Sequence, residues 1–175
     1  RVAILPTGTE LVPVGQPVQV GDIIEYNSLV MAAQVRAWGG LATRLPIIPD
    51  IFDAIRAKVL QAALDHDLVL LNAGSSAGAE DFSASVIASV GEVLVHGIAV
   101  RPGHPVILGM IHLEGRSVPV IGVPGYPVSA ALTLEIFVAE LIARWLGAQQ
   151  AEPAQVKARL TRKVTSPPGD DDYLR

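Results

Sequence analysis

The chain has 175 residues, of which half are apolar and only 17% are charged, so one well-buried globular domain is expected rather than disorder. The formal net charge of −4 argues against a nucleic-acid partner, because binding to a phosphate backbone requires a basic surface. The absence of cysteine excludes disulfides, thiolate zinc sites and thiol nucleophiles, and it fits a cytoplasmic location.

The N-terminal part of the chain is predicted to contain a strand, an irregular segment and a helix. Residues 2–5 form a buried strand, and residues 10–25, which contain several prolines and glycines, form short irregular strands and turns. Asn27 is predicted to cap a helix that ends at Gly39-Gly40. The apolar face of this helix is predicted to consist of Val30, Ala33 and Ala37.

The middle of the chain continues the alternation of strands and helices. Residues 42–48 form a second strand, and Asp50 is predicted to cap the following helix, with Asp53 in its first turn. The apolar face of that helix is predicted to consist of Ile51, Ile55, Val59 and Ala62. The continuous apolar run 67–72 is typical of a central parallel strand, and a helix is expected over about 81–90.

Extended segments and one long helix follow. Residues 93–100 are expected to be extended, and strands at 106–113 and 117–123 form a hairpin. A helix over about 127–146 begins at a proline, which suits a first helical turn. Three charged residues indicate that this helix does not span a membrane: Glu135, Glu140 and Arg144.

The alternation of strands and helices predicts an α/β fold, a three-layer sandwich around a mostly parallel central sheet. We expect residues 1–150 to form this domain. Residues 151–175 are expected to be a linker and the start of a truncated C-terminal β domain, in which 155–164 alternates like a strand. The chain is therefore expected to be a fragment of a longer protein.

Three loops that follow predicted strands should meet at one edge of the sheet, where ligands of such folds bind: 6–10, 72–81 and 123–129. In the second loop, the small residues Gly74–Gly78 allow backbone N–H groups to approach phosphate oxygens closely. A loop of glycine and serine is weak evidence on its own, and Asp81 could simply cap the next helix.

Charged residues near these loops are candidates for chemistry, each with a simpler alternative. Glu10 could bind a metal or act as a base, or be a solvated turn residue, and Asp50 could be only a helix cap. Arg101 could form bidentate contacts with oxyanions and His104 could donate to an anion, although both residue types more often lie on the surface without such a role. The residues alone thus predict an α/β domain that binds a small anionic ligand near three carboxylates.

Six motifs occur in order over residues 2–147: 7–11 (TGTEL), similar to S-T-G-[DN]-E-L; 21–28 (GDIIEYNS), to G-x-I-x-x-S/T-N; 48–50 (IPD), to I-x-D; 72–81 (NAGSSAGAED), to S-G-G-x-S-x-G-x-x-D; 101–105 (RPGHP), to K-P-G-K-P; and 124–129 (PGYPVS), to P-G-N-P-V-S. Together they resemble the motifs of the molybdopterin molybdotransferases, the MoeA and gephyrin E-domain type, whose pterin-binding domain is MogA/MoaB-like. Any one motif is weak evidence, but six in order are strong evidence.

The resemblance implies an enzyme of molybdenum cofactor biosynthesis that inserts molybdate into adenylylated molybdopterin and releases AMP, with Mg2+ as its metal. It implies that Glu10, Asp50 and Asp81 are catalytic and that Asp81 and Glu10 bind the metal. The ligand-binding residues would be Thr7, Gly8, Gly74, Ser75, Ser76, Gly78, Arg101, Gly103, His104, Pro124, Gly125, Pro127 and Ser129. The full-length protein would be a cytoplasmic homodimer, with neither nucleic acid nor membrane as a partner of this domain.

Three positions depart from the family's pattern. Ala73 stands in place of a glycine, His104 in place of a lysine and Tyr126 in place of an asparagine. Two alternative functions stay open: a molybdopterin adenylyltransferase, which shares the fold, and a non-catalytic molybdopterin-binding regulatory module. Against the adenylyltransferase, residues 75–81 (SSAGAED) lack the Gly-Gly-Thr-Gly loop with Arg-Asp that this enzyme type more often has.

Overall fold

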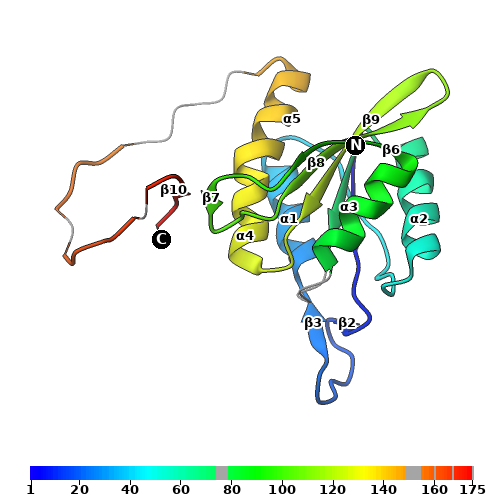
Figure 1. Cartoon of the computed structure of the whole chain (residues 1–175), viewed down its shortest axis with the longest axis horizontal. Coiled ribbons are helices and arrows are strands. Elements are labelled where there is room, and N and C mark those ends of the chain that lie inside the picture. The colour runs from blue at the N-terminus through cyan, green and yellow to red at the C-terminus, as the bar shows by residue number, and fades with distance from the viewer. Residues whose placement is uncertain (74–78, 149–154, 160, 167, 175) are drawn as a thin grey trace.

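The computed structural model describes residues 1–73, 79–148, 155–159, 161–166 and 168–174, except for the side chains of residues 79–81. Its centre is a six-stranded sheet (Figure 1) with the order β4 (Ala42–Arg44), β1 (Val2–Pro6), β5 (Leu68–Asn72), β9 (Arg116–Val123), β8 (Ile107–Leu113) and β6 (Gly91–His96). The first four strands run parallel, whereas β8 is antiparallel to β9 and β6 is antiparallel to β8. The prediction of an α/β fold with a mostly parallel sheet is confirmed.

Helices cover both faces of this sheet (Figure 1). One layer consists of α2 (Phe52–Asp65) and α3 (Ala79–Val90), and the other of α1 (Asn27–Ala37) and a long helix. The long helix is made of α4 (Pro127–Thr133), a π-helical turn (Leu134–Val138) and α5 (Ala139–Leu146). Successive side chains of a strand point to opposite faces, so Ala3 of β1 packs in the first layer and Ile4 in the second. Burial on both faces explains why β1 and the first four residues of β5 are apolar.

Helix α1 differs from the sequence prediction at its start and on its buried face. Tyr26 occupies the N-cap position and Asn27 is the first helical residue, so the prediction of an Asn27 cap was wrong. The side-chain amide of Asn27 instead donates to the carbonyl of Gly125, 98 residues away. The buried residues are Ser28, Met31, Ala32 and Val35, whereas the predicted Val30, Ala33 and Ala37 are exposed. Small apolar residues occur on both faces of α1, so their spacing did not identify the face that packs.

The start of α2 also differs from the prediction. Strand β4 ends at Arg44, before Pro46, which has no N–H to continue a ladder, and only Ile48 forms a further bridge, to Thr7. The N-cap of α2 is Ile51, with no side-chain cap, so the prediction that Asp50 caps this helix was wrong. The predicted apolar face is otherwise confirmed, because Ile55, Val59 and Ala62 are buried and Ile51 is exposed.

The C-terminal half follows the predictions with two differences. The β8–β9 hairpin and the helix over 127–146 are confirmed, but the extended stretch 93–100 is interrupted after β6 and resumes as β7 (Val100–Arg101). The described residues of 155–164 are largely exposed and form no strand, so that prediction was wrong. None of the described strand pairings involves this segment. Further along the chain, β10 (Asp171–Asp172) pairs with β7.

A small arm projects from the body of the domain (Figure 1). It consists of β2 (Leu11–Pro13) and β3 (Ile23–Glu25), which pair in parallel as a separate two-stranded sheet and agree with the irregular strands predicted for 10–25. The N–H of Ile23 donates to the carbonyl of Glu10 at 2.8 Å, which ties the arm to the loop after β1. Within the described ranges, no helix has the length and apolar character required to cross a bilayer.

The close approach of α3 to the sheet depends on Gly109 of β8. A Cβ at this position would lie 2.6 Å from Ile87 Cγ2 on α3 and 2.6 Å from the carbonyl oxygen of Glu92 on β6. We expect Gly109→Ala to lower the free energy of unfolding by about 2–3 kcal/mol, because the helix or the edge strand must move, as measured by urea denaturation. Gly115→Ala is the matched control: its Cβ would meet nothing within 4 Å, and only a φ of 77° opposes it, at a cost of about 1 kcal/mol. Equal losses in the two variants would contradict this account.

Candidate functional site

Three parallel strands end side by side at one edge of the sheet. Pro6 at the end of β1 lies beside Asn72 at the end of β5, and Asn72 lies beside Val123 at the end of β9. The loops that follow these strands therefore leave from the same edge, as expected, and two of them lead into α3 and α4. This is the place where open α/β sheets bind ligands.

Asn72 links all three strand ends through hydrogen bonds. Its side chain is buried, and Nδ2 donates to the carbonyls of Val123 at 3.3 Å and Pro124 at 3.1 Å. Its own carbonyl accepts from the backbone N–H of Thr7 at 2.9 Å and from Thr7 Oγ1 at 3.4 Å. Our sequence analysis did not single out Asn72, although a polar amide that ends the buried run 67–72 was a usable signal. The residue holds the first and third loops at fixed positions relative to each other.

The loop after β1 is joined to the segment before α2 by a reciprocal pair of hydrogen bonds. The N–H of Thr9 donates to Asp50 Oδ2 at 3.4 Å, and the N–H of Asp50 donates to Thr9 Oγ1 at 3.2 Å. The N–H of Gly8 donates to the carbonyl of Ile48 at 3.0 Å. These contacts keep the Asp50 carboxylate at the carboxyl edge and explain why it is not available as a cap for α2.

Glu10 turns back toward Gly8 and keeps one oxygen without a partner. Glu10 Oε1 is buried and has no hydrogen-bond partner among the described residues. A Cβ on Gly8 would lie 2.7 Å from Leu11 Cγ and 3.0 Å from Glu10 Oε2, so this position requires glycine. A buried carboxylate oxygen without a donor is costly, and a bound cation or ligand would offset that cost.

The Asp50 carboxylate is affected by its burial and by its neighbours. Partial burial raises the pKa of Asp50 above its ordinary value, the hydrogen bond from Thr9 lowers it, and the nearby charge of Glu10 raises it further. A carboxylate whose ionised form is disfavoured by burial and by a nearby acidic group is typical of a functional site, because stability alone would not select for it.

The raised pKa of Asp50 predicts a pH-dependent cost in stability. The folded state binds more protons than the unfolded state at pH values between the ordinary 3.8 and the raised value, so stability falls as the pH rises through this window. We expect Asp50→Asn, whose amide oxygen can still accept from Thr9, to be more stable than the wild type at pH 7. The pH-dependent part of the difference should vanish well below pH 3.8, where the carboxyl is protonated in both states. Thermal unfolding of the wild type and Asp50→Asn between low pH and pH 7 measures this difference in stability. A variant that is less stable than the wild type at pH 7 would contradict the expected direction.

The loop after β5 lies mostly outside the described residues. Four predicted ligand-binding residues lie there: Gly74, Ser75, Ser76 and Gly78. Helix α3 begins at Ala79, slightly earlier than predicted, so Asp81 belongs to its first turn, and its side chain is not described. The predicted roles of these five residues stay predictions.

The turn after β9 contributes the third wall of the site. The carbonyl of Pro124 accepts from Asn72, and the carbonyl of Gly125 accepts from Asn27 Nδ2 at 2.8 Å. Pro127 begins α4, as predicted, and Ser129 is buried in the first turn of this helix. The turn is therefore fixed by two side-chain amides from distant parts of the chain.

The turn 101–105 packs beside α4, and no described contact joins it to Glu10 or Asp50. Gly103 is buried, and a Cβ there would lie 3.7 Å from Thr133 Oγ1. His104 is exposed, and its carbonyl accepts from the N–H of Ile98. Arg101 Nε forms an ion pair with Asp170 Oδ2 at 2.5 Å, next to the pairing of β7 with β10. The described structure thus gives Arg101 a carboxylate partner that the sequence analysis did not foresee.

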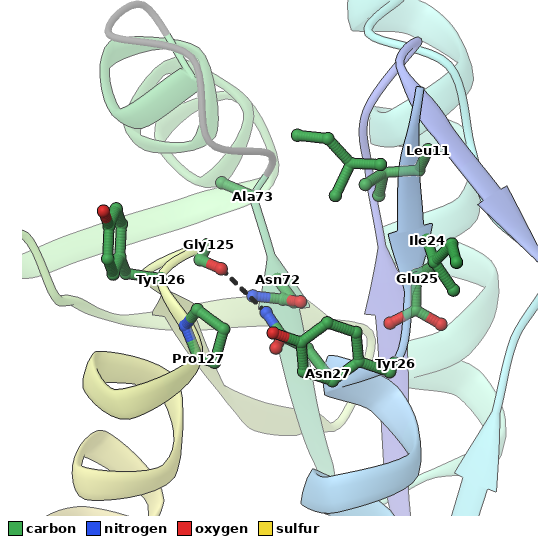
Figure 2. A pocket seen from close by; sticks show the side chains of 11 residues that line it. Leu11, Ile24, Glu25, Tyr26, Asn27, Asn72, Ala73, Gly125, Tyr126 and Pro127 are labelled. Carbon is green, nitrogen blue, oxygen red and sulfur yellow. Dashed lines mark hydrogen bonds between the residues drawn. The ribbon is translucent and has the colours of Figure 1, made fainter. Parts of the chain in front are cut away.

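A pocket of about 180 Å³ opens between the arm and the turn after β9 (Figure 2). Two of the predicted ligand-binding residues, Gly125 and Pro127, line it. The sequence analysis named Ala73 and Tyr126 only as departures from the family's motifs, and it did not select the remaining lining residues: Leu11, Ile23, Ile24, Glu25, Tyr26, Asn27 and Asn72. Most of the lining residues lie in two of the quoted motifs, 21–28 and 124–129. The motifs therefore located the pocket, although the residues selected within them include only two of its lining residues.

An α/β domain with a pocket and two carboxylates at the carboxyl edge of parallel strands belongs to the class that binds small ligands there. Residues 3–144 match the model of the family described as "Probable molybdopterin binding domain". The chain therefore belongs to the molybdopterin-binding domain family.

Relatives and solved structures agree with this assignment. The chain is 32% identical over its whole length to a molybdopterin molybdenumtransferase of Haemophilus influenzae and 31% identical to molybdopterin molybdenumtransferase 2 of Mycobacterium tuberculosis, of which it covers 43% and 44%. It thus spans less than half the length of these relatives. A structure of the molybdopterin biosynthesis MoeA protein of Pyrococcus horikoshii has a TM-score of 0.73 at 36% identity, over 83% of this chain and 35% of that chain. The MoaB protein of Pyrococcus furiosus, at 15% identity and a TM-score of 0.62, shares the fold, over 85% of this chain and 96% of its own.

Proposed function

We propose that the full-length protein is a molybdopterin molybdotransferase, which inserts molybdate into adenylylated molybdopterin and releases AMP. The observation that carries the proposal is the pair of hydrogen bonds between Thr9 and Asp50, which holds a second carboxylate beside Glu10 at the carboxyl edge. Relatives named molybdopterin molybdenumtransferase over the whole length of the chain support the same reaction. Residues 1–150 are the pterin-binding domain, and 151–175 are a linker and the start of a further β domain.

The substrate's anionic groups bind along the edge formed by the three loops. The segments 74–78 and 124–129 hold the phosphates, with Thr7 and Gly8 on the first loop. Arg101, Gly103 and His104 bind oxyanions. The ion pair with Asp170 uses Arg101 Nε, and the terminal nitrogens of a guanidinium carry four further N–H donors for such an anion.

Glu10, Asp50 and Asp81 are the proposed catalytic carboxylates, and Glu10 and Asp81 bind a magnesium ion. Two observations fit a nearby cation. A cation would give the unpartnered Glu10 Oε1 a partner, and its positive charge would lower the raised pKa of Asp50. The described side chains do not include a group of three or more potential metal ligands, and the side chain of Asp81 is not among those described. When bound, magnesium stabilises negative charge on the phosphate oxygens. The full-length protein acts in the cytoplasm as a homodimer.

An assay of the full-length protein tests the reaction against both alternatives. We expect AMP to be released from adenylylated molybdopterin only when molybdate is present. Formation of adenylylated molybdopterin from ATP would indicate the adenylyltransferase instead. Tight molybdopterin binding in calorimetry without either turnover would indicate a regulatory module and would exclude the proposal.

A further inference from the structure

Two tyrosines occupy helix N-cap positions at the pocket, and helix capping does not explain them. Tyr26 precedes α1 and Tyr126 precedes α4, and neither makes a side-chain capping hydrogen bond. An N-cap residue is normally a short polar one whose oxygen accepts from the first helical N–H groups. In α1 this role falls to Glu25, whose carboxylate accepts from the N–H of Ser28 at 2.8 Å and from its hydroxyl at 2.6 Å. The tyrosines are therefore not needed to start their helices.

Core packing does not explain the two tyrosines either. Tyr126 is 73% exposed and Tyr26 is 44% exposed. Neither takes part in the ring contact of the described chain, which joins Phe52 to Phe82. One exposed aromatic ring on a surface requires no special reason. Two such rings on the same small pocket suggest a ligand that covers them.

The two rings come from opposite walls of the pocket. Figure 2 shows Tyr126 on the turn after β9 and Tyr26 at the junction of β3 and α1, with Asn27 and Pro127 in the region between them. Asn72 Nδ2 donates to two backbone carbonyls and Asn27 Nδ2 donates to one, so these residues fix the walls. The rest of the lining is mostly apolar, including Leu11 and Ile24 of the arm. Recognition in this pocket thus relies more on contact with ring faces than on free amide donors.

We infer that Tyr26 and Tyr126 are substrate-binding residues that stack against a flat heteroaromatic ring of the substrate. Tyrosine faces bind flat π systems well, and this contribution does not depend on the edge groups of the ring. The inference rests on the proposed function, because adenylylated molybdopterin carries two such rings, the pterin and the adenine. The pocket has room for one of these rings. Separate binding measurements with a pterin and with an adenine nucleotide show which ring it takes.

Binding experiments with the full-length protein test the inference. The probes are 6-hydroxymethylpterin, followed by its fluorescence, and AMP, followed by calorimetry. We expect Tyr26→Ala and Tyr126→Ala each to raise the Kd of one probe about 10-fold, and the phenylalanine variants to stay within about 2-fold of wild type. Tyr173→Ala is the matched control, because Tyr173 is 44% exposed, like Tyr26, but does not line the pocket. The Kd of each probe for this variant should equal that of the wild type.

Each outcome decides the inference separately from the proposed function. It is overturned if neither probe binds the wild type, if the alanine variants bind both probes as the wild type does, or if phenylalanine loses as much affinity as alanine. Molybdate-dependent AMP release together with unchanged binding in the alanine variants would remove the stacking role and keep the function. Tyrosine-dependent binding without turnover would keep the stacking role and remove the function.

Discussion

Asn72→Ala is expected to lower the free energy of unfolding by about 2–3 kcal/mol, the larger of the stability effects at the site. The substitution removes the only described donor to the carbonyl of Pro124. It also removes one of the two donors to the carbonyl of Val123, but that carbonyl still accepts from the N–H of Ala73. A buried carbonyl without a donor loses the hydrogen bond and retains the cost of its removal from water. Urea denaturation of the wild type and the variant measures the difference.

The same substitution should also affect the reaction. Asn72 holds the turn at Pro124 against the strand end that carries Thr7, so its loss allows the first and third loops to shift relative to each other. A displacement of about 1 Å at a reacting centre can reduce a rate about 100-fold, and we expect a loss of this order in kcat of the full-length protein.

Asn27→Ala provides the matched control for Asn72→Ala. Asn27 is also an amide that donates to the turn after β9, but it is only half-buried and makes one bond, to Gly125. Its loss should cost about 1 kcal/mol or less. If the two variants unfold at the same urea concentration, Asn72 does not have the special role that its buried position suggests.

Asp81→Asn is expected to reduce molybdate-dependent turnover of the full-length protein by a factor of about 100 or more, with little change in stability. Asp81 belongs to the first turn of α3, the helix that follows the loop after β5, and under the proposed function its carboxylate binds the metal. Asparagine keeps the size and the capacity to accept hydrogen bonds but removes the charge. Steady-state rates at saturating substrate, with thermal unfolding of the same preparations, provide the two readouts.

The competing explanation for Asp81 is that it merely stabilises the start of its helix. Asp53 tests this explanation, because it is an acidic residue in the first turn of α2, the neighbouring helix on the same face of the sheet. Both asparagine variants should lose about 0.3–1 kcal/mol of stability through the helix dipole. Only Asp81→Asn should lose turnover. Equal rates in the two variants would assign Asp81 to the helix alone and remove it from the mechanism.

Several local features could be predicted from the sequence because short-range physics decides them. The run 67–72 became the central strand β5, and Pro127 began a helix where proline tolerates the first turn. The helix caps were the weakest predictions. Asn27 and Asp50 are both good capping residues by type, yet each hydrogen-bonds to a distant segment and leaves the cap position to a neighbour.

The residues that line the pocket show the same limit. Sequence analysis placed the ligand at the loops after the strands, which is where the pocket lies. It did not select Asn72 or Tyr26 as binding residues, and it named Tyr126 only as a departure from the family's pattern. The contacts that fix the pocket walls join distant positions: Asn72 donates to Pro124, at a separation of 52 residues, and Asn27 donates to Gly125, at a separation of 98.

The sequence by itself determined the layers of this protein, because apolar runs of strand length that alternate with helices can be buried only as a sheet covered on both faces. It also determined which loops lie together, because parallel strands end at the same edge. Only the tertiary structure decided which amide reaches which carbonyl and which side chains face the pocket. The physical reason is that such contacts depend on the register and packing of segments that are distant in the chain. The periodicity of a single segment carries no information about them.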